Sequence, residues 1–163
     1  MCGIIGIVGR EPVAGHLVEA LKRLEYRGYD SAGVAVATNG TLKRLRSAGR
    51  VAELAAAADR EKLTGNTGIA HTRWATHGEP SEKNAHPHLS GGIAVVHNGI
   101  IENYVELRAE LEKRGHKYKS ETDTESVAHL LSDEFKKSGD LAQAMREVCK
   151  ELRGSFTLLA IHS

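Results

Sequence analysis

The sequence predicts a layered α+β domain whose strands pair in antiparallel sheets. Short runs rich in β-branched residues come early in the chain, and segments with helical spacing lie between and after them. The early strands are joined as hairpins rather than through helices, which favours antiparallel over parallel pairing. The chain has 163 residues, of which 40% are hydrophobic and 26% charged, and this suffices for one core.

The first two elements are predicted to be a strand and an amphipathic helix. Gly3–Val8 is short, apolar and β-branched, as expected of a buried strand. Its glycines do not have the GxGxxG spacing and follow no strand, which argues against dinucleotide binding. A helix should follow Pro12, a residue that suits a first turn. The apolar face of this helix consists of Val13, Leu17, Leu21 and Leu24.

A hairpin comes next. Ala32–Ala37 and Leu42–Ala48 are predicted strands, and Asn39-Gly40 between them favours a tight turn. The next predicted elements are an alanine-rich helix over Val51–Ala58 and a strand over Gly68–Thr72.

The second half of the chain begins with a long segment of little periodicity. Residues 73–90 are rich in His, Pro, Gly and Asn, so we expect an ordered and functional loop. A strand over Ile93–His97 then leads into Asn98-Gly99. The remaining predicted elements are a helix over Asn103–Arg114 ended by Gly115, a helix begun by a capping box between Thr122 and Glu125, a helix over Leu141–Leu152 and a strand over Phe156–Ile161. Because the last strand runs almost to Ser163, we expect residues 1–163 to form a domain that is incomplete at its C-terminal end.

Composition and charge narrow the function classes. A formal net charge of +1 gives no electrostatic case for nucleic acid or an anionic membrane. No apolar run reaches the length of a membrane span, and the first residues make a poor signal peptide. Cys2 and Cys149 are too few and too far apart for a disulfide framework, so a reducing cytoplasm is expected. We expect Cys149, beside the apolar stripe of its helix, to be an inert core thiol.

The second residue carries the strongest chemical signal. Removal of Met1 would leave Cys2 with both a thiol and a free α-amine. An α-amine has a pKa of about 7.7–8.0 and suits general base work near neutrality. A nucleophile served by its own terminal amine is a known catalytic arrangement. Taken alone, the start of the chain also fits a cysteine that simply begins a buried strand.

Three further segments are dense in polar groups, namely Tyr26–Gly33, His71–His88 and His97–Asn103. Together with the Met1–Gly3 start they resemble, over essentially the whole chain, the class II glutamine amidotransferases. Within that family they resemble the enzymes that aminate sugar phosphates. The resemblance implies an N-terminal-nucleophile hydrolase with a four-layer αββα sandwich of two antiparallel sheets. It also implies hydrolysis of L-glutamine, with no metal and no cofactor.

The resemblance assigns the catalytic roles. Cys2 would attack the side-chain amide of glutamine and form a thioester, with its α-amine carrying the proton. Asn98, through its side-chain amide, and Gly99, through its backbone N–H, would form the oxyanion hole. On pattern alone, Asn98-Gly99 fits a hairpin turn equally well. Arg27 would organise the surroundings of the nucleophile, with an Arg27–Asp30 ion pair as the structural alternative.

The resemblance also assigns the substrate contacts. Arg73 would hold the glutamine α-carboxylate through its planar fork, and Thr76 and His77 would add polar contacts. Asp123 would hold the α-ammonium, although an acidic residue in a first helical turn also suits the helix dipole. Trp74 would shape the exit for ammonia, or else serve as a hydrophobic anchor.

In intact members of the family's sugar-phosphate branch, ammonia passes to a second domain that aminates fructose 6-phosphate. We see no such domain in residues 1–163, and expect a homodimer only of the longer enzyme. Two other readings stay open. A non-catalytic module would need Cys2 only for packing. A metal hydrolase would use some of the nine histidines, among them the His86-Pro87-His88 pair, although HExxH and CxxC spacings are absent.

Overall fold

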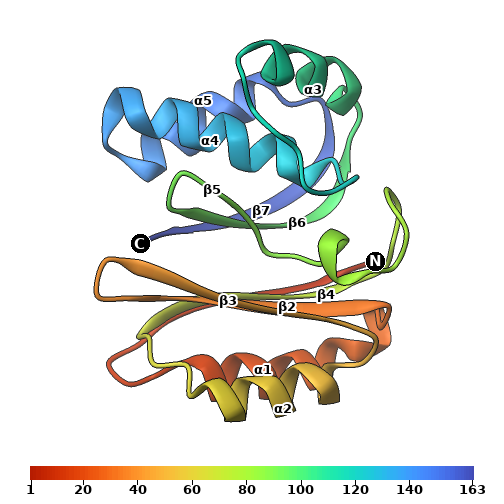
Figure 1. Cartoon of the computed structure of the whole chain (residues 1–163), viewed down its shortest axis with the longest axis vertical. Coiled ribbons are helices and arrows are strands. Elements are labelled where there is room, and N and C mark those ends of the chain that lie inside the picture. The colour runs from red at the N-terminus through yellow and green to blue at the C-terminus, as the bar shows by residue number, and fades with distance from the viewer.

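Two sheets lie face to face between two layers of helices in the computed structural model, which describes all of residues 1–163 (Figure 1). The first sheet has the strand order β1-β4-β2-β3 and the second the order β5-β6-β7, and every neighbouring pair is antiparallel. The predicted αββα sandwich is therefore confirmed. The strands are β1 (Gly3–Val8), β2 (Ser31–Thr38), β3 (Thr41–Ala48), β4 (Thr67–Arg73), β5 (His88–Ser90), β6 (Ile93–Ile101) and β7 (Gly154–His162).

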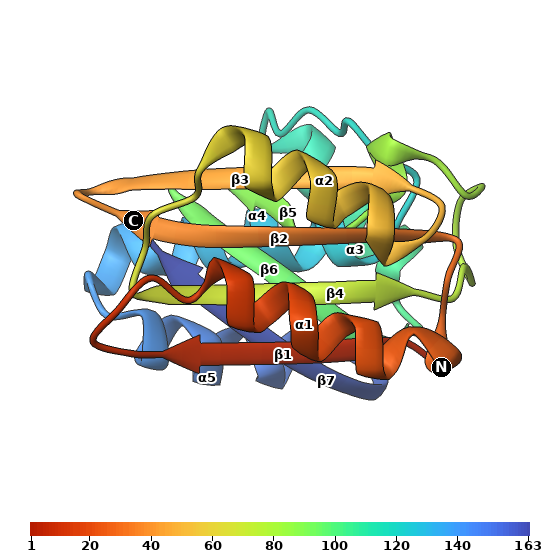
Figure 2. The same ribbon diagram turned by 90° about the horizontal axis from the view of Figure 1, so that it is seen from below.

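The helices cover the outer faces of the two sheets. Figure 2 shows two helices crossing the outer face of the first sheet, α1 nearest β1 and β4, and α2 nearest β2 and β3. The other three helices cover the second sheet, with α4 against β5 and β6. The helices are α1 (Ala14–Leu24), α2 (Val51–Glu61), α3 (Tyr104–Lys113), α4 (Thr124–Ser138) and α5 (Leu141–Glu151), with 3-10 turns η1 (Glu25–Arg27) and η2 (Glu82–Asn84). None of these helices combines the length and the apolar character needed to cross a bilayer.

Each helical layer seals an apolar core. The predicted face of α1 is confirmed, since Leu17 and Leu21 are fully buried against the first sheet together with Leu54 of α2. The core of the other layer contains Leu131 of α4 and Val148 of α5. Burying a side chain of this kind contributes about 1.5–3 kcal/mol, so these two cores hold most of the fold's hydrophobic stabilisation.

The hairpin of β2 and β3 confirms the turn prediction. Asn39 and Gly40 both have positive φ, 48° and 73°, which is the conformation a two-residue hairpin turn needs. Two other elements differ from prediction. Residues 73–90 contain η2 and β5 as well as loop, and α2 runs on to Glu61.

The second Asn-Gly pair behaves differently from the first. Asn98 and Gly99 lie within β6, which continues to Ile101 and pairs with β7 along its length. The reading of Asn98-Gly99 as a hairpin turn is therefore wrong. An Asn-Gly pair turns the chain only where the flanking segments pair with each other, and here both flanks pair with β7.

Two local predictions on the helices are also wrong. Thr122 and Glu125 form no capping box, because α4 begins at Thr124 and Glu125 instead accepts hydrogen bonds from Lys119 and Ser120. Cys149 is exposed rather than buried, because α5 turns Ala144 and Val148 toward the core.

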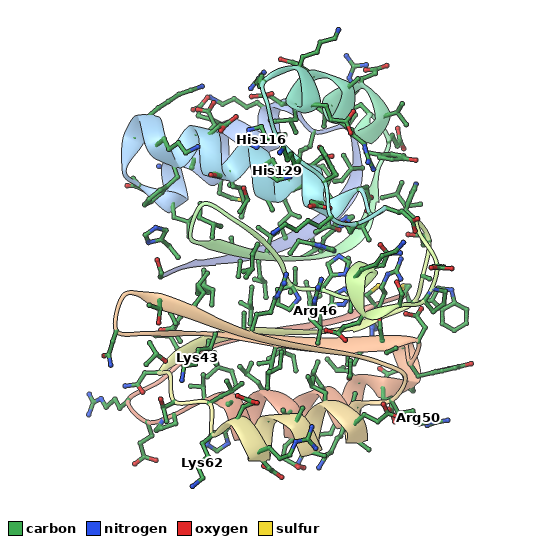
Figure 3. All side chains as sticks on the ribbon, viewed as in Figure 1. Lys43, Arg46, Arg50, Lys62, His116 and His129 are labelled. Atoms are coloured by element: carbon green, nitrogen blue, oxygen red, sulfur yellow. The ribbon has the colours of Figure 1, made fainter.

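The layer between the sheets is divided in two. Toward one end it is filled by the small apolar cluster of Ala35, Ile69, Ala94, Val96 and Ile161. The rest contains four buried histidines, His71, His86, His88 and His97. Arg46 of β3 donates to the carbonyls of Lys83 and Ala85 and so ties the histidine-bearing segment to the first sheet (Figure 3).

Candidate active site

The nucleophile candidate lies where the first sheet begins. Gly3, the first residue of β1, pairs with Thr72 and donates its N–H to the Thr72 hydroxyl at 3.2 Å. This register places the Cys2 sulfur 3.4 Å from the Trp74 backbone nitrogen and 3.7 Å from its carbonyl oxygen. Burial raises the pKa of the Cys2 thiol, against the opposing effect of the Trp74 N–H. The thiol is therefore protonated at neutral pH and needs a base to become a nucleophile.

The second sheet brings Asn98 and Gly99 to this cysteine. The Cys2 backbone nitrogen donates to the Asn98 side-chain oxygen at 3.0 Å, a contact that joins residues 96 positions apart. Because Oδ1 is the acceptor in this bond, the Asn98 NH2 remains available as a donor. Gly99 has φ of +129°, and a Cβ at this position would lie 2.1 Å from the Ser155 carbonyl oxygen. Glycine is thus required at this position of β6 by both conformation and space.

Arg73 is buried at the end of β4 and turned toward the loop that follows. Its guanidinium donates to the carbonyls of His77, Gly78 and Glu79, the last two at 3.0 and 3.1 Å. The Asp30 carboxylate lies 3.9 Å away. Burial lowers the pKa of the Arg73 guanidinium, and the charge of Asp30 opposes this shift. The predicted carboxylate fork is therefore occupied by loop carbonyls in this conformation.

Asp123 faces the same cleft from the start of α4. One carboxylate oxygen, Oδ2, accepts the Ile101 N–H at 2.9 Å and lies 4.0 Å from His77 Nδ1. The other, Oδ1, lies 3.7 Å from His97 Nδ1, beyond hydrogen-bond length. The Asp123 side chain makes no capping bond to the helix. Its burial, at 4% exposed, and an Oδ1 atom whose only hydrogen bond is a long one, 3.5 Å from the Thr124 hydroxyl, fit a cation-binding role better than a role in capping.

Thr76 and His77 lie on the loop at the cleft mouth. His77 Nδ1 is 3.3 Å from the Thr76 hydroxyl, and the His77 ring packs edge-on against Tyr104. The cleft is lined by Cys2, Arg73, Trp74, Thr76, His77, Gly99 and Asp123 among others. The structure thus brings together, from both sheets, all the substrate and catalytic residues that the sequence predicted. Asn98 joins them through its bond to the Cys2 nitrogen and lines an adjacent hollow that Cys2 also lines.

The two supporting residues are both beside the nucleophile. Arg27 donates from Nε to the Cys2 carbonyl at 3.1 Å, whereas the alternative Arg27–Asp30 pair is absent. Asp30 instead accepts from Ser31 and from the backbone N–H of Ala75. Trp74 is 51% exposed and packs edge-on with Tyr29, so it is a surface residue at the rim rather than a buried anchor.

Sequence reasoning missed three residues that hold the site together. Thr72 accepts the Gly3 N–H, and Asp30 receives the Ala75 N–H beside Arg73. Thr124 lies under Asp123 with its hydroxyl between two histidines. Thr72 and Asp30 belong to polar segments already singled out, and Thr124 lies at the predicted start of a helix. The choice of partner for each depends on contacts across the sheets.

The histidines do not assemble a metal centre. No group of three or more His, Cys, Asp or Glu side chains has metal-binding geometry anywhere in residues 1–163. His86 and His88 direct their Nε2 atoms to the hydroxyls of Thr124 and Thr122, at 2.7 and 2.9 Å. The geometry therefore offers the metal-hydrolase reading no ligand set. His116 and His129 form a separate pair in the upper helical layer, with ring centres 4.5 Å apart (Figure 3).

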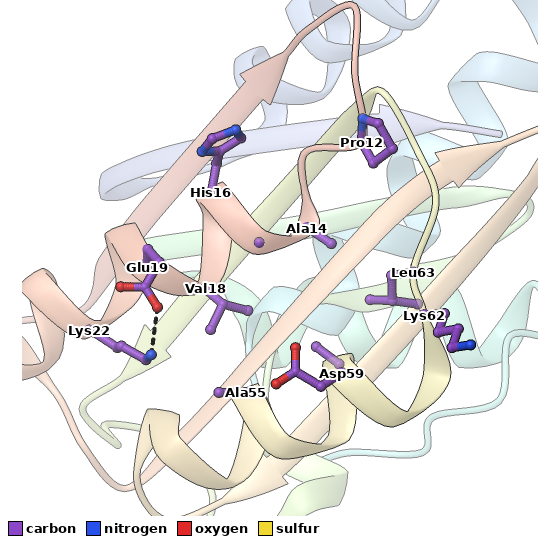
Figure 4. Close-up of a pocket in the computed structure, with 12 residues that line it drawn as sticks. Pro12, Ala14, His16, Val18, Glu19, Lys22, Ala55, Asp59, Lys62 and Leu63 are labelled. Atoms are coloured by element: carbon purple, nitrogen blue, oxygen red, sulfur yellow. Dashed lines mark hydrogen bonds and ion pairs between the residues drawn. The ribbon is translucent and has the colours of Figure 1, made fainter.

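The largest hollow lies elsewhere. A groove of about 510 Å³ runs between α1 and α2, as Figure 4 shows, and none of the site residues lines it. Of its charged side chains, Glu19 and Lys22 are paired with each other, and Asp59 and Lys62 also line the groove. The cleft at Cys2 has a free volume of only about 20 Å³, room for a single water. In this conformation the cleft is therefore too small for an amino acid.

Comparison with known proteins agrees with this geometry. A family model described as "Glutamine amidotransferase domain" matches residues 71–163. A glutamine–fructose-6-phosphate aminotransferase [isomerizing] of Shewanella oneidensis is 57% identical over 162 residues, and one of Streptomyces coelicolor is 56% identical over 166. These alignments cover 99% and 100% of this chain but only 27% of each relative, so the chain spans about a quarter of their length.

A solved structure supports the same assignment. The glutamine phosphoribosylpyrophosphate amidotransferase of B. subtilis superimposes with a TM-score of 0.83 and 27% identity, over 99% of this chain and 35% of that one. A class II glutamine aminotransferase domain protein from Silicibacter pomeroyi shares the fold, with a TM-score of 0.57 at 12% identity. On sequence and fold together, this chain belongs to the glutamine amidotransferase family.

Proposed function

We propose that the chain hydrolyses L-glutamine to glutamate and ammonia through a thioester on Cys2. The observation that carries the proposal is the meeting of three groups from two sheets. The Cys2 thiol lies at the start of β1, while Asn98 and Gly99 on β6 are aligned beside it, with Asn98 bonded to the Cys2 nitrogen at 3.0 Å. No packing role requires a nucleophile, an amide and an obligatory glycine at one point.

The reaction begins once Met1 has been removed, since Met1 turns the Cys2 nitrogen into a peptide amide without basicity. The freed α-amine takes the thiol proton while sulfur bonds to the glutamine amide carbon. The Asn98 NH2 and the Gly99 N–H stabilise the oxyanion. The C–N bond then breaks, and the amine's proton leaves with ammonia. Water next attacks the thioester, giving glutamate and restoring the thiol.

The rest of the cleft holds the amino acid end of the substrate. Arg73 binds the α-carboxylate, which replaces the carbonyls of residues 77–79 that the guanidinium holds in this conformation. Thr76 and His77 contact the same carboxylate from the loop. Asp123 pairs with the α-ammonium through Oδ1. Arg27 and Trp74 keep the nucleophile's surroundings in place and shape the rim.

In the longer protein the ammonia serves a second reaction. The relatives are named glutamine–fructose-6-phosphate aminotransferases, and we infer that residues 1–163 form the glutaminase domain of such an enzyme without the C-terminal end of that domain. Fructose 6-phosphate would then be aminated by a domain outside this chain, and the whole enzyme would be a homodimer. A thiol nucleophile favours a reducing compartment such as the cytoplasm.

The test is intact mass before and after treatment with the glutamine analogue 6-diazo-5-oxo-norleucine. We expect a mass without methionine and a single adduct, mapped to Cys2. Cys2→Ala should show no adduct and no ammonia release while keeping its circular dichroism. Cys149→Ser is the matched control, because it removes an exposed thiol far from the cleft and should keep the adduct. A single adduct on Cys149, or turnover by Cys2→Ala, would overturn the proposal.

A further inference from the structure

Directly beneath the cleft, two buried histidines share one hydroxyl. Thr124 Oγ1 lies 2.7 Å from His86 Nε2 and 2.9 Å from His97 Nδ1. Thr124 is fully buried at the first position of α4, next to Asp123. Its hydroxyl is also 3.5 Å from Asp123 Oδ1. Three polar groups thus surround a hydroxyl that has one proton to donate.

The negative charge of Asp123 determines which ring nitrogen of the neutral His97 carries the proton. Burial lowers the pKa of both His86 and His97, so both rings are neutral at pH 7. A neutral imidazole carries a proton on one nitrogen and a lone pair on the other. A lone pair on His97 Nδ1 would face the Asp123 carboxylate at 3.7 Å, whereas an N–H there is attracted to it. His97 is therefore protonated on Nδ1, and that N–H donates to the Thr124 hydroxyl.

This bond determines whether Asp123 Oδ1 is free to accept a hydrogen bond from a substrate. The His97 N–H has two possible acceptors, the Thr124 hydroxyl at 2.9 Å and the carboxylate at 3.7 Å. While the Thr124 oxygen accepts the His97 N–H, the Thr124 O–H is directed to His86 Nε2 at 2.7 Å. Asp123 Oδ1 is then left with only the long 3.5 Å contact to the same hydroxyl, whereas Oδ2 accepts the Ile101 N–H. An unsaturated carboxylate oxygen in a buried cleft is a strong acceptor for a cation.

We propose that Thr124 is a positioning residue that makes the site selective for substrates bearing an α-ammonium, by holding the His97 N–H away from Asp123 Oδ1. The inference rests on the proposed function, of which it deepens the substrate recognition. Without the hydroxyl, His97 turns its N–H to Oδ1, since a buried donor without a partner is costly. The histidine then competes with the ammonium for the same oxygen.

The test compares two substrates on the same protein. One is glutamine and the other is 4-carbamoylbutanoate, which is glutamine without its α-amino group. Ammonia release gives kcat and KM for each, and the ratio of the two kcat/KM values measures recognition of the α-ammonium. In Thr124→Val we expect this ratio to fall by about tenfold, through KM for glutamine, as for the loss of one ionic hydrogen bond. Thr124→Ser keeps the hydroxyl and should keep the ratio.

Thr122→Val is the matched control. It removes a buried hydroxyl whose hydrogen-bond partners are His88 Nε2 at 2.9 Å and Ser120 Oγ at 3.1 Å, and not the Asp123 carboxylate. It should affect both substrates equally. The ratio of the two kcat/KM values does not depend on the fraction of protein that is folded. If Thr124→Val does not fold at all, Thr124→Cys should show a smaller fall in the same ratio.

The outcomes separate the two ideas. Wild-type chain that releases ammonia from neither substrate would overturn the proposed function and this inference with it. Wild-type chain that prefers glutamine, with Thr124→Val or Thr124→Cys retaining the full preference, would overturn the inference alone. A fall of the same size in Thr122→Val would also overturn it, since any buried hydroxyl would then have the same effect.

Discussion

The helical layers and the layer between the sheets are built from different kinds of residue. Against the helices, the main buried clusters are aliphatic, as with Leu17 and Leu54 on one side and Leu131 and Val148 on the other, although α4 also buries polar side chains such as His129. Between the sheets only one part is aliphatic, and it is a smaller cluster than either of the other two. The rest is a network of histidines and threonines that reaches up to the cleft.

The difference separates stability from chemistry within one domain. Aliphatic burial is non-directional and stabilises the fold without selecting a site. The histidine network is directional, and it leaves His71 Nδ1, His86 Nδ1 and His97 Nε2 buried without partners. Such atoms cost free energy, so the two helical cores stabilise a fold that also carries a polar layer beneath its reactive end.

Of the substitutions that test this comparison, Asn98→Ala at the reactive end of the polar layer is expected to change kcat the most. Asn98→Ala removes the proposed oxyanion donor and should lower kcat for glutamine by about 10²–10³. The thermal midpoint should change little, because Asn98 is only half-buried and its one bond is to Cys2. Ammonia release and differential scanning fluorimetry would measure both. A kcat within threefold of wild type would contradict the oxyanion role.

The opposite outcome is expected in the helical layer. Leu131→Ala empties a fully buried position of α4 and should lower the free energy of unfolding by about 2–5 kcal/mol. The KM for glutamine should stay near wild type in the protein that remains folded. Urea denaturation gives the stability, and kinetics at low temperature give KM. If Leu131→Ala raised KM for glutamine as much as Arg73→Lys, the helical core would contribute to substrate binding as well as to stability.

A smaller effect is expected from Arg73→Lys, which keeps the charge but loses the planar fork. We expect KM for glutamine to rise by about tenfold with kcat much less affected, because the residue contacts the carboxylate end and not the reacting amide. Steady-state kinetics measure the split. An unchanged KM would remove Arg73 from substrate binding and leave it as a tie for the loop carbonyls that it holds.

The smallest effect is expected from pH between 7 and 6. Burial lowers the pKa of His71 and of His88 to about 3, whereas an unfolded histidine titrates near 6.5. Between these values the unfolded chain binds more protons than the folded one, so stability falls as pH falls from about 6.5. Each 1 kcal/mol lost should lower the thermal midpoint by about 2–4 °C.

The pH effect has a control and a clear contradiction. Burial raises the pKa of Glu125, but bonds from His129, Ser120 and Lys119 outweigh it and lower it to about 2. The stability this carboxylate contributes is lost only below about pH 4.5, outside the window tested. Leu131→Ala should be less stable at every pH but show the same slope. A thermal midpoint that stays flat from pH 7 to 6 would contradict neutral buried histidines.

Much of the fold follows from local patterns. The face of α1 and the hairpin at Asn39-Gly40 are as predicted, since both depend on residues close together in the chain. The errors come where distant partners decide. Asn98-Gly99 lies within a strand because β7 pairs with the residues on both sides of it. Glu125 makes no capping bond at Thr122 because its carboxylate accepts the backbone N–H groups of residues 119 and 120 instead. Cys149 is exposed because a neighbouring stripe of α5 faces the core.

The sequence by itself determined the secondary structure elements, the layered fold class and the residues that carry the chemistry, because spacing and side-chain type are local properties. Only the tertiary structure decided which of those residues meet. It placed the Asn98 side chain within hydrogen-bond distance of the Cys2 nitrogen and directed the Arg73 guanidinium to carbonyls of the loop that follows it. It also brought two histidines to the hydroxyl of Thr124. The physical reason is that hydrogen bonds act over about 3 Å, and residues far apart in the chain reach that distance only when the two sheets pack.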